Sequence, residues 1–353
     1  MTATVAVIGG PGSRAVEMAL RACAVAGVTA SPSNDGSQVA RLWRSARAVL
    51  VAASARGWVS GLPRRPLVAV LDDVAGSESG AWRLAVQLGA ETVFELDQDP
   101  RRMVDWLALA AEPAGRRGVV VGVAGACGGA GASTLAAAIA LRSGPTAKVT
   151  LLDADPAGGG IDVLLGVERA AGARWPDLAG SRGVVAADAL AAALPQVDGV
   201  RVLSWVPNPE STLLVGAMDA VLSAAVRGSD VVVVDLPRSA DEAAAHAAAR
   251  SDRVVLIAPA SVRAVASGAA AVTRWSDTGA DVGLVVRHPG PADLAAAAVA
   301  DALGLPLLGV VPTDDRLANL GDRGRFVRAV QRSPVGSAAA AIASAVLTTR
   351  EAA

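Results

Sequence analysis

The sequence predicts an α/β protein in which two parallel sheets follow one another along the chain. Short Val, Leu and Ile runs alternate with helical stretches throughout the 353 residues, a pattern typical of parallel sheets covered by helices on both faces. A glycine-rich turn at residues 125–131 joins a strand to a helix, as in doubly wound nucleotide-binding domains. The turn-rich segment 113–118 divides the chain. We therefore expect one domain at residues 1–112, a linker at 113–118 and a second domain at 119–353.

The first domain alternates strand-like and helical segments that are separated by Gly, Pro, Ser or Asp. Its predicted strands are residues 5–8, 48–53, 67–71 and 92–94, and its predicted helices are residues 13–26, 38–45, 80–88 and 100–111.

The second domain repeats the alternation on a larger scale, and its strands are nearly continuous apolar runs, as expected for strands buried on both faces. A doubly wound sheet binds its ligand at the carboxyl ends of its strands. The predicted strands are residues 119–124, 149–153, 200–204, 231–235, 254–258, 282–286 and 307–311, and the predicted helices include residues 211–227, 241–249, 261–275 and 291–303.

The glycine-rich turn has the spacing of a phosphate-binding loop but lacks its lysine. In a G-x-x-x-x-G-K-[ST] loop, backbone N–H groups approach the phosphates and the hydroxyl binds magnesium. Gly131 takes the place of the last glycine and Ser133 that of the hydroxyl, while Ala132 stands where the lysine would be. Lys148 is the single lysine of the sequence, so no neighbouring lysine replaces it. The residues expected to hold the phosphates are Gly128, Gly129, Ala130, Gly131, Ala132, Ser133 and Thr134.

Acidic residues end two of the strands that follow this loop. Asp153 and Asp155 come at the end of one buried strand, and Asp235 ends another. A carboxylate at a buried strand end is costly unless a cation lies close to it, and Mg²⁺ prefers oxygen ligands. The sequence therefore predicts a nucleoside triphosphate site with a metal position formed by Ser133, Asp153 and Asp235.

Two other interpretations of this region stay open. A dinucleotide-binding Rossmann unit of an NAD(P)-dependent oxidoreductase also places an acid about 20 residues after its glycine turn, and Asp153 could serve as that acid. Its third glycine position is occupied by Thr134, however, and the paired hydroxyls of Ser133 and Thr134 favour a phosphate loop. The other alternative is an interaction scaffold that binds no nucleotide.

Composition limits the classes of function. The net charge is −1, from 32 basic and 33 acidic residues, so no overall field attracts nucleic acid or anionic lipid. The apolar runs fall short of the roughly 18 to 20 residues that a membrane-spanning helix needs, and residues 1–10 contain no basic leader. Two cysteines and two histidines without ligand spacing argue against a zinc site and a histidine-based triad. We expect a soluble, cytoplasmic protein without direct nucleic-acid contacts.

With these motifs in view, the sequence resembles the MinD/ParA superfamily of P-loop (SIMIBI) proteins. The turn 127–134, CGGAGAST, is similar to the deviant Walker motif KGGxGKTT, while residues 152–156 and 234–238 resemble the two switches. A receiver-like domain ahead of such a domain narrows the resemblance to the CpaE/TadZ branch, and within it to actinobacterial septum-site-determining (Ssd, CpaE-like) proteins. The resemblance implies a receiver-like domain followed by a doubly wound, mostly parallel-sheet MinD/ParA-like domain, with ATP and Mg²⁺ as cofactors.

The sequence departs from this family pattern at its charged positions. The signature lysine, which reaches across a dimer to the partner's nucleotide, maps to Cys127, and the second lysine maps to Ala132. Arg287 stands where an asparagine often reads adenine. The N-terminal domain has no phosphorylatable aspartate at residues 51–54 and no lysine near residues 94–96. We expect it to be a pseudo-receiver, a docking module without phosphotransfer.

The missing lysines should affect binding and hydrolysis differently. A charge-assisted hydrogen bond is worth about 1.5 to 3 kcal/mol, so its loss weakens binding by roughly ten- to a hundredfold. Cations that neutralise transition-state charge are worth on the order of 10³ to 10⁵ in rate. We therefore expect ATP binding with slow or absent hydrolysis, in which Asp155 orients water and Arg238 supplies the missing charge.

The resemblance implies a role in cellular placement, either in septum-site determination during cell division or in localising a Tad/Flp pilus secretion apparatus. The implied partners are ATP, a second copy of the chain in a homodimer, and cell-division or pilus-secretion proteins. MinD relatives bind membrane through a basic amphipathic C-terminal helix, whereas residues 336–347 are alanine-rich without Lys or Arg. We expect this segment to pack against the domain, and recruitment to the inner face of the membrane, the septum or the pole to proceed through a partner.

Overall fold

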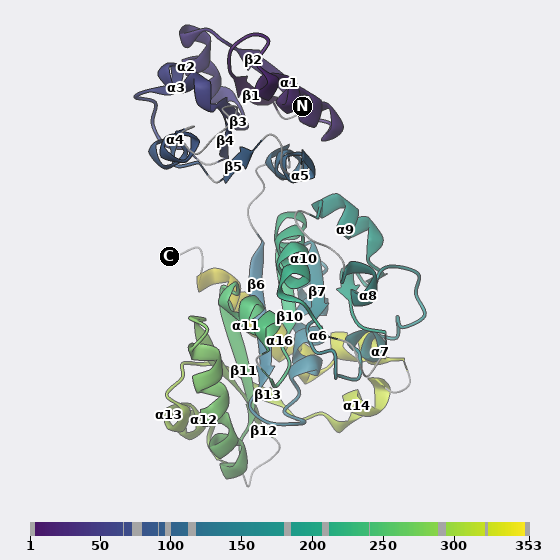
Figure 1. Cartoon of the computed structure of the whole chain (residues 1–353). Helices are drawn as coiled ribbons and strands as arrows, with labels where there is room; N and C mark the ends of the chain where they lie inside the picture. Colours follow the sequence, from purple (N-terminus) through teal and green to yellow (C-terminus); the bar gives the residue numbers. More distant parts are fainter. Residues whose placement is uncertain are drawn as a thin grey trace. The chain divides into compact units, whose positions relative to one another are not determined.

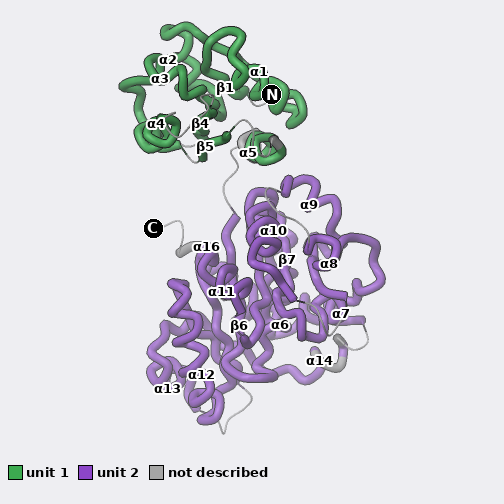
Figure 2. The backbone as a smooth tube through the Cα atoms, viewed as in Figure 1, with its two compact units in different colours: residues 1–115 green, residues 116–353 purple. Residues whose placement is uncertain are grey.

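Parallel β-sheets flanked by helices form the framework of both halves of the chain (Figure 1). The computed structural model divides it into two units, Met1–Gly115 and Arg116–Ala353 (Figure 2). The predicted linker 113–118 lies, apart from Gly118, outside the described residues. The structure describes residues 4–65, 67–72, 80–90, 92–95, 100–111, 118–179, 185–206, 212–239, 241–288, 294–321 and 324–349.

The sheet of the first unit has the strand order β2-β1-β3-β4-β5, with parallel pairing throughout. This order is that of flavodoxin-like and CheY-like domains. The strands are β1 (Thr4–Ile8), β2 (Thr29–Ser33), β3 (Ala48–Ala52), β4 (Val68–Asp72) and β5 (Thr92–Glu95). The helices are α1 (Arg14–Val25), α2 (Gly36–Ser45), α3 (Arg56–Val59), α4 (Ala81–Leu88) and α5 (Pro100–Ala111), with a short 3₁₀ turn η1 (Ala53–Ala55).

Strand β2 was not predicted, because its sequence TASPS has no apolar run. It lies at the edge of the sheet and contains Pro32, which an edge strand tolerates because one side of it needs no ladder hydrogen bonds. Asp35 then begins α2 by accepting a hydrogen bond from the Ser37 N–H at 3.2 Å. The edge position therefore explains both the polar sequence and the missed strand.

The sheet of the second unit has the order β13-β12-β11-β6-β10-β7-β9-β8, and among its described strands only the pair β8 and β9 is antiparallel. The strands predicted for this unit all form, with bounds that shift by at most two residues. They are β6 (Val119–Gly125), β7 (Val149–Asp153), β8 (Gln196–Val197), β9 (Val200–Leu203), β10 (Val231–Asp235), β11 (Arg253–Pro259), β12 (Val282–His288) and β13 (Leu307–Pro312).

Helices cover both faces of this sheet and form two separate hydrophobic cores. Helices α8 to α13 pack on one face, and α6, α7, α14, α15 and α16 pack on the other. The helices are α6 (Ala132–Ser143), α7 (Ile161–Leu165), α8 (Trp175–Leu178), α9 (Ala187–Ala193), α10 (Val215–Gly228), α11 (Glu242–Ala249), α12 (Val262–Ser276), α13 (Ala296–Leu303), α14 (Asp315–Gly321), α15 (Phe326–Gln331) and α16 (Pro334–Thr349).

The continuous apolar sequence of β6 follows from this double coverage. Successive side chains of a strand point to opposite faces of the sheet. Val121 and Val123 enter the core beneath α6 and α16, whereas Val120 and Ala124 enter the core on the other face. Both sets are buried, so every position of the strand is apolar.

The alanine-rich C-terminal segment packs against the domain, as predicted. It forms α16, which contacts α6 and β13. Its buried side chains include Ala339, Ile342 and Val346. Among the described residues, no helix combines the length and apolar character required to cross a bilayer.

Candidate functional site

The glycine-rich turn lies at the carboxyl end of β6 and leads directly into α6. Gly129 and Gly131 have φ angles of 70° and 100°, in the left-handed region that favours glycine. A Cβ atom on Gly129 would meet open space, so the turn is accessible on that side. The Ala126 N–H donates to the Ile257 carbonyl of β11 at 2.9 Å, which fixes the turn to the sheet.

Helix α6 begins at Ala132 without a side-chain cap. The first N–H groups of a helix have no partner within it, and they carry the positive end of the helix dipole. Such a helix start is suited to bind an anion. The predicted phosphate-binding residues 128–134 all lie in this turn and the first turn of α6. Lys148 precedes β7 and therefore lies at the amino ends of the parallel strands, away from the glycine turn at their carboxyl ends.

The predicted metal-binding side chains meet beside this helix start. Asp153 and Asp235 are register neighbours on the adjacent parallel strands β7 and β10, and Ser133 lines the same cavity as both carboxyls. This cavity has a volume of about 320 Å³, and we call it the carboxylate cavity. Its lining residues are Ser133, Thr134, Asp153, Asp155, Gly158, Gly159, Gly160, Ile161, Val163, Leu164 and Asp235.

Burial makes both strand-end carboxyls weaker acids than an ordinary aspartate. Asp153 and Asp235 are 2% and 4% exposed. Burial raises the pKa of Asp153 from its ordinary value to about 6, against the opposing effect of its hydrogen bonds. Burial raises the pKa of Asp235 well above its ordinary value, and the neighbouring charge of Asp153 raises it further. A divalent cation between them would favour the ionised forms.

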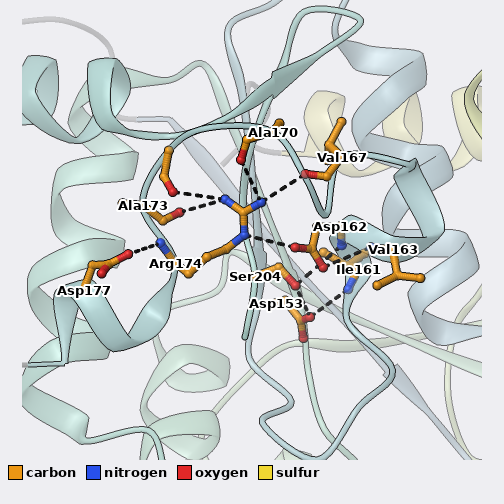
Figure 3. A network of polar contacts seen from close by, with 11 residues as sticks. Asp153, Ile161, Asp162, Val163, Val167, Ala170, Ala173, Arg174, Asp177 and Ser204 are labelled. Atoms are coloured by element: carbon orange, nitrogen blue, oxygen red, sulfur yellow. Dashed lines mark hydrogen bonds and ion pairs between the residues drawn. The ribbon is translucent and has the colours of Figure 1, made fainter. Parts of the chain in front are cut away.

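Asp153 also anchors the loop that borders the cavity (Figure 3). Its Oδ2 accepts hydrogen bonds from the Ile161 N–H and the Ser204 hydroxyl, both at 2.9 Å. Its Oδ1 accepts a hydrogen bond from the Asp155 N–H at 3.1 Å. One carboxylate thus holds both ends of the loop 154–161. Its backbone carbonyl accepts hydrogen bonds from Trp175 Nε1 at 2.6 Å and Trp205 Nε1 at 3.0 Å.

A buried ion pair extends this network (Figure 3). Arg174 Nε donates to Asp162 Oδ2 at 3.0 Å, and the two side chains are 8% and 4% exposed. The remaining guanidinium N–H groups donate to main-chain carbonyls of the segment that follows α7. These carbonyls belong to Val167, Ala170, Gly172 and Ala173. Sequence reasoning did not find Arg174, because it lies in no motif. It also did not single out Ser204, although this hydroxyl ends the predicted strand 200–204 and that position was the available signal.

The two residues predicted to assist hydrolysis occupy different positions around the turn. Asp155 lines the cavity, and its Oδ1 accepts a hydrogen bond from the Ala157 N–H at 3.1 Å. Arg238 is exposed and lies against the glycine turn, with Nη1 3.3 Å from the position of a Cβ atom on Gly128. The structure therefore places the Arg238 guanidinium next to a turn that contains no lysine.

A second cavity adjoins the turn and has a volume of about 120 Å³. It shares Thr134 with the carboxylate cavity and also borders Gly131. Arg287, at the carboxyl-terminal part of β12, lines it together with Thr313. Arg287 Nε and Thr313 Oγ1 are buried without a hydrogen-bond partner among the described residues. Unpaired buried polar atoms are costly, so both atoms suit a polar ligand.

The residues present fit a magnesium nucleotide. The open glycine turn and uncapped helix start suit the phosphates, and Ser133 with Asp235 offers oxygen ligands to the metal. In the part of the chain that the structure describes, no cluster of three or more His, Cys, Asp or Glu side chains could hold a metal by itself. Mg²⁺ characteristically takes only one or two carboxylates, together with phosphates and water.

Without Mg²⁺, the titration of Asp153 should lower the free energy of unfolding as the pH rises to about 6. In the unfolded chain this carboxyl titrates at about 3.9, whereas folding holds its proton until about 6. Between these values the folded state binds more protons, so the free energy of unfolding falls as the pH rises. Urea unfolding of wild type and Asp153→Asn from about pH 4 to about pH 7 measures this. The stability difference, wild type minus variant, should decrease with pH; a constant difference would contradict the assignment.

The strand order contradicts the dinucleotide alternative. In the Rossmann order 3-2-1-4-5-6, the strand with the glycine turn lies next to the strand that carries the ribose-binding acid. Here β10 lies between β6 and β7, so Asp153 is separated from the glycine turn by a whole strand. The Rossmann interpretation is therefore wrong.

Comparison with known proteins relates both units to other chains. A family model described as the Rv3660c-like, CheY-like N-terminal domain matches residues 13–118. Protein Rv3660c of Mycobacterium tuberculosis (strain ATCC 25618 / H37Rv) is 41% identical over 304 residues, which is 85% of this chain and 85% of that protein. Protein MT3760 of Mycobacterium tuberculosis (strain CDC 1551 / Oshkosh) matches to the same extent.

Solved structures resemble the second unit in fold. A ParA family ATPase from Chlorobium tepidum has a TM-score of 0.56 at 16% identity and covers 65% of this chain and 99% of that chain. The septum site-determining protein MinD from Pyrococcus horikoshii, complexed with Mg-ADP, has a TM-score of 0.53 at 20% identity. It covers 66% of this chain and 97% of that chain. A chain of the MinC:MinD cell division protein complex of Aquifex aeolicus has a TM-score of 0.55 at 20% identity and covers 65% of this chain and 96% of that chain. The predicted fold class, a CheY-like domain followed by a MinD/ParA-like P-loop domain, is confirmed.

Proposed function

This chain belongs to the same family as Mycobacterium tuberculosis Rv3660c, and from that premise we propose that it is a positioning protein controlled by a magnesium nucleoside triphosphate, with little or no hydrolysis. ATP is the triphosphate that the MinD/ParA resemblance implies. The proposal assigns the phosphates to residues 128–134 and the metal to Ser133, Asp235 and Asp153. We also propose the domain boundaries predicted from the sequence, which are residues 1–112 and 119–353.

One observation carries this proposal: the open glycine turn lies beside a pair of buried strand-end carboxyls whose pKa values are raised. A main-chain cradle binds phosphate and two acids bind the cation that accompanies it. Bound Mg²⁺ would supply positive charge to the phosphates and to the carboxylates. Asp153 would then exchange some of its hydrogen bonds to the loop for the metal's coordination sphere. Nucleotide occupancy would in this way alter the loop 154–161.

The missing lysines support weak or absent turnover. Arg238 lies against Gly128, and we assign to it part of the charge that the lysines of related loops provide. Asp155 lines the carboxylate cavity, where it would orient water. A protein that binds but hydrolyses slowly would remain in its triphosphate-bound form and act as a long-lived positional mark.

The cellular role follows from the CpaE/TadZ-like and Ssd-like sequence pattern. We assign the chain to septum-site determination in cell division, with localisation of a Tad/Flp pilus secretion apparatus as the second role that this pattern supports. The partners in either role would be cell-division or pilus-secretion proteins, with a homodimer as the active assembly. The solved MinD relative that is complexed with MinC gives a precedent for such partners. Recruitment to the membrane, septum or pole would proceed through a partner.

The first unit would provide the docking surface. The residues at the carboxyl ends of β1 and β3, namely Gly9, Gly10 and Ala53, carry no acid that could accept a phosphoryl group or bind Mg²⁺. Its CheY-like strand order without these acids supports a pseudo-receiver that binds a partner. A nucleotide-independent scaffold is the second candidate function, and the absence of both loop lysines favours it.

Localisation of a fluorescent fusion in the native cells tests the proposal. We expect foci at the septum or pole for the wild type and a dispersed signal for Ser133→Ala, because this variant lacks the hydroxyl that would bind the metal. Ser267→Ala on α12 is a matched control whose hydroxyl bonds only within its own helix. Foci that persist in Ser133→Ala would favour the nucleotide-independent scaffold, and a dispersed wild type would contradict a positioning role.

A further inference from the structure

The cavity that contains Arg287 meets the carboxylate cavity at Thr134. The Arg287 cavity also borders the glycine turn at Gly131, so it lies within reach of a nucleotide whose phosphates occupy that turn. Gly131 and Ile257 border the cavity at the turn, and Val311 and Leu317 add apolar walls. Its volume of about 120 Å³ far exceeds the roughly 10–15 Å³ that one water needs. Apolar walls with a few polar groups are typical of small-molecule and cofactor sites, and a nucleotide base is a ligand of this kind.

Arg287 presents only hydrogen-bond donors to this cavity. A guanidinium has five N–H donors in a fixed plane and no acceptor. Its Nε is buried without a partner among the described residues, and Nη1 lies 3.7 Å from the position of a Cβ atom on Gly131. The β12 backbone is fixed at this point, because the Ala260 N–H donates to the Arg287 carbonyl at 2.9 Å. The ligand edge that faces Arg287 must therefore supply acceptors.

The two purines differ at the edge that such a group would contact. Guanine offers two neighbouring acceptors, O6 and N7, whereas adenine offers N7 beside an amino group that is itself a donor. Arginine pairs with both acceptors of guanine, while asparagine and glutamine, which carry a donor and an acceptor, pair with adenine. We propose that the Arg287 cavity selects a guanine nucleotide over an adenine nucleotide. The inference rests on the proposed function and changes only the base.

The acidic residues of the cavity are compatible with guanine but do not distinguish it from adenine. Asp314 and Asp315 line the cavity, and Asp314 Oδ1 accepts a hydrogen bond from the Arg316 N–H at 3.1 Å. Carboxylates accept hydrogen bonds and could bind the N–H groups of guanine or the amino group of adenine. The discrimination therefore depends on Arg287.

Isothermal titration of the full chain with GMPPNP and AMPPNP, each with Mg²⁺, tests the proposal. A bidentate contact of this kind discriminates by about 1–3 kcal/mol, so we expect GMPPNP to bind roughly five- to 150-fold more tightly. Arg287→Asn should abolish or reverse this ratio, and Arg287→Lys, which keeps the charge but loses the planar pair of donors, should reduce it. The exposed Arg263→Asn on α12 is the matched control and should leave the ratio unchanged.

Inosine triphosphate separates the Arg287 contact from the acidic residues. It keeps O6 and N7 but lacks the amino group of guanine, so it should bind more tightly than ATP and lose this advantage in Arg287→Asn. Equal binding of ATP and inosine triphosphate to the wild type would overturn the assignment of the contact to Arg287.

The remaining outcomes are distinguishable. AMPPNP binding as tight as GMPPNP binding would overturn the base preference while leaving the proposed function intact. An equal loss of both nucleotides in Arg287→Asn, with an unchanged melting temperature, would make Arg287 a phosphate ligand and would also overturn it. Failure of the wild type to bind either nucleotide would refute the proposed function itself, and the base preference with it.

Discussion

Restoring lysines to the glycine turn should raise the rate of triphosphate hydrolysis by on the order of 10³-fold or more. The change is Ala132→Lys, alone and combined with Cys127→Lys. An ammonium at position 132 would extend from the first residue of α6, beside the N–H groups that would hold the phosphates. Neutralising the charge that develops in the transition state accelerates the reaction far more than it strengthens ground-state binding. Phosphate release under single-turnover conditions measures the rate.

The matched control for this prediction is Ala132→Met, which has similar length and no charge. It should leave hydrolysis at the wild-type level, so that a gain in Ala132→Lys reports the ammonium. Binding affinity should improve only about ten- to a hundredfold in the lysine variant. Lysine variants that bind nucleotide and hydrolyse no faster would show that lysine loss does not limit the reaction. Arg238, already against Gly128, would then be the residue to replace next.

Removing Arg174 should cost the second unit about 3–5 kcal/mol of stability, because it leaves a buried charge without its partner. In Arg174→Ala, Asp162 loses its ion pair, and the carbonyls of Val167 and Ala170 lose their donors. The total stability of a domain is about 5–15 kcal/mol, so a large part of it would be lost. Urea unfolding, followed by the tryptophan fluorescence to which the stacked Trp175 and Trp205 contribute, measures the change.

Two comparison variants make this result specific. Arg169→Ala removes an exposed arginine from the same segment and should change stability by no more than about 0.5 kcal/mol. Arg174→Met combined with Asp162→Leu removes both charges, and it should be more stable than Arg174→Ala. A loss below about 1 kcal/mol in Arg174→Ala would contradict the structural role that the network assigns to this pair.

The parts of this fold that sequence could predict are those in which local pattern and burial agree. The Val-rich strands β6 and β10 are buried on both faces, so their apolar runs are unambiguous. The strand-end positions of Asp153 and Asp235 followed from those runs, because the carboxyl ends of parallel strands lie on the same side of a sheet. The glycine spacing then predicted the turn beside them.

The remaining features depend on contacts between distant residues. Ser204 lies 51 positions from the carboxylate of Asp153 that it bonds, and no local pattern indicates that pairing. Strand β2 has a polar sequence because it lies at an edge. The cavity around Arg287 and Thr313 joins residues from β12 and from the segment after β13. Sequence reasoning could identify Arg287 as a departure from a family pattern, but the cavity and its unpaired atoms appear only in the fold.

The central claim is that main-chain N–H groups of the glycine turn bind a polyphosphate without the help of a lysine. Titration of the ¹⁵N-labelled chain with inorganic triphosphate and Mg²⁺, monitored through backbone amide resonances, tests it without any contribution from a base. We predict saturable shifts concentrated at Gly128, Gly129, Gly131 and the first residues of α6. Resonances of this turn that stay unchanged at millimolar magnesium triphosphate would contradict the claim.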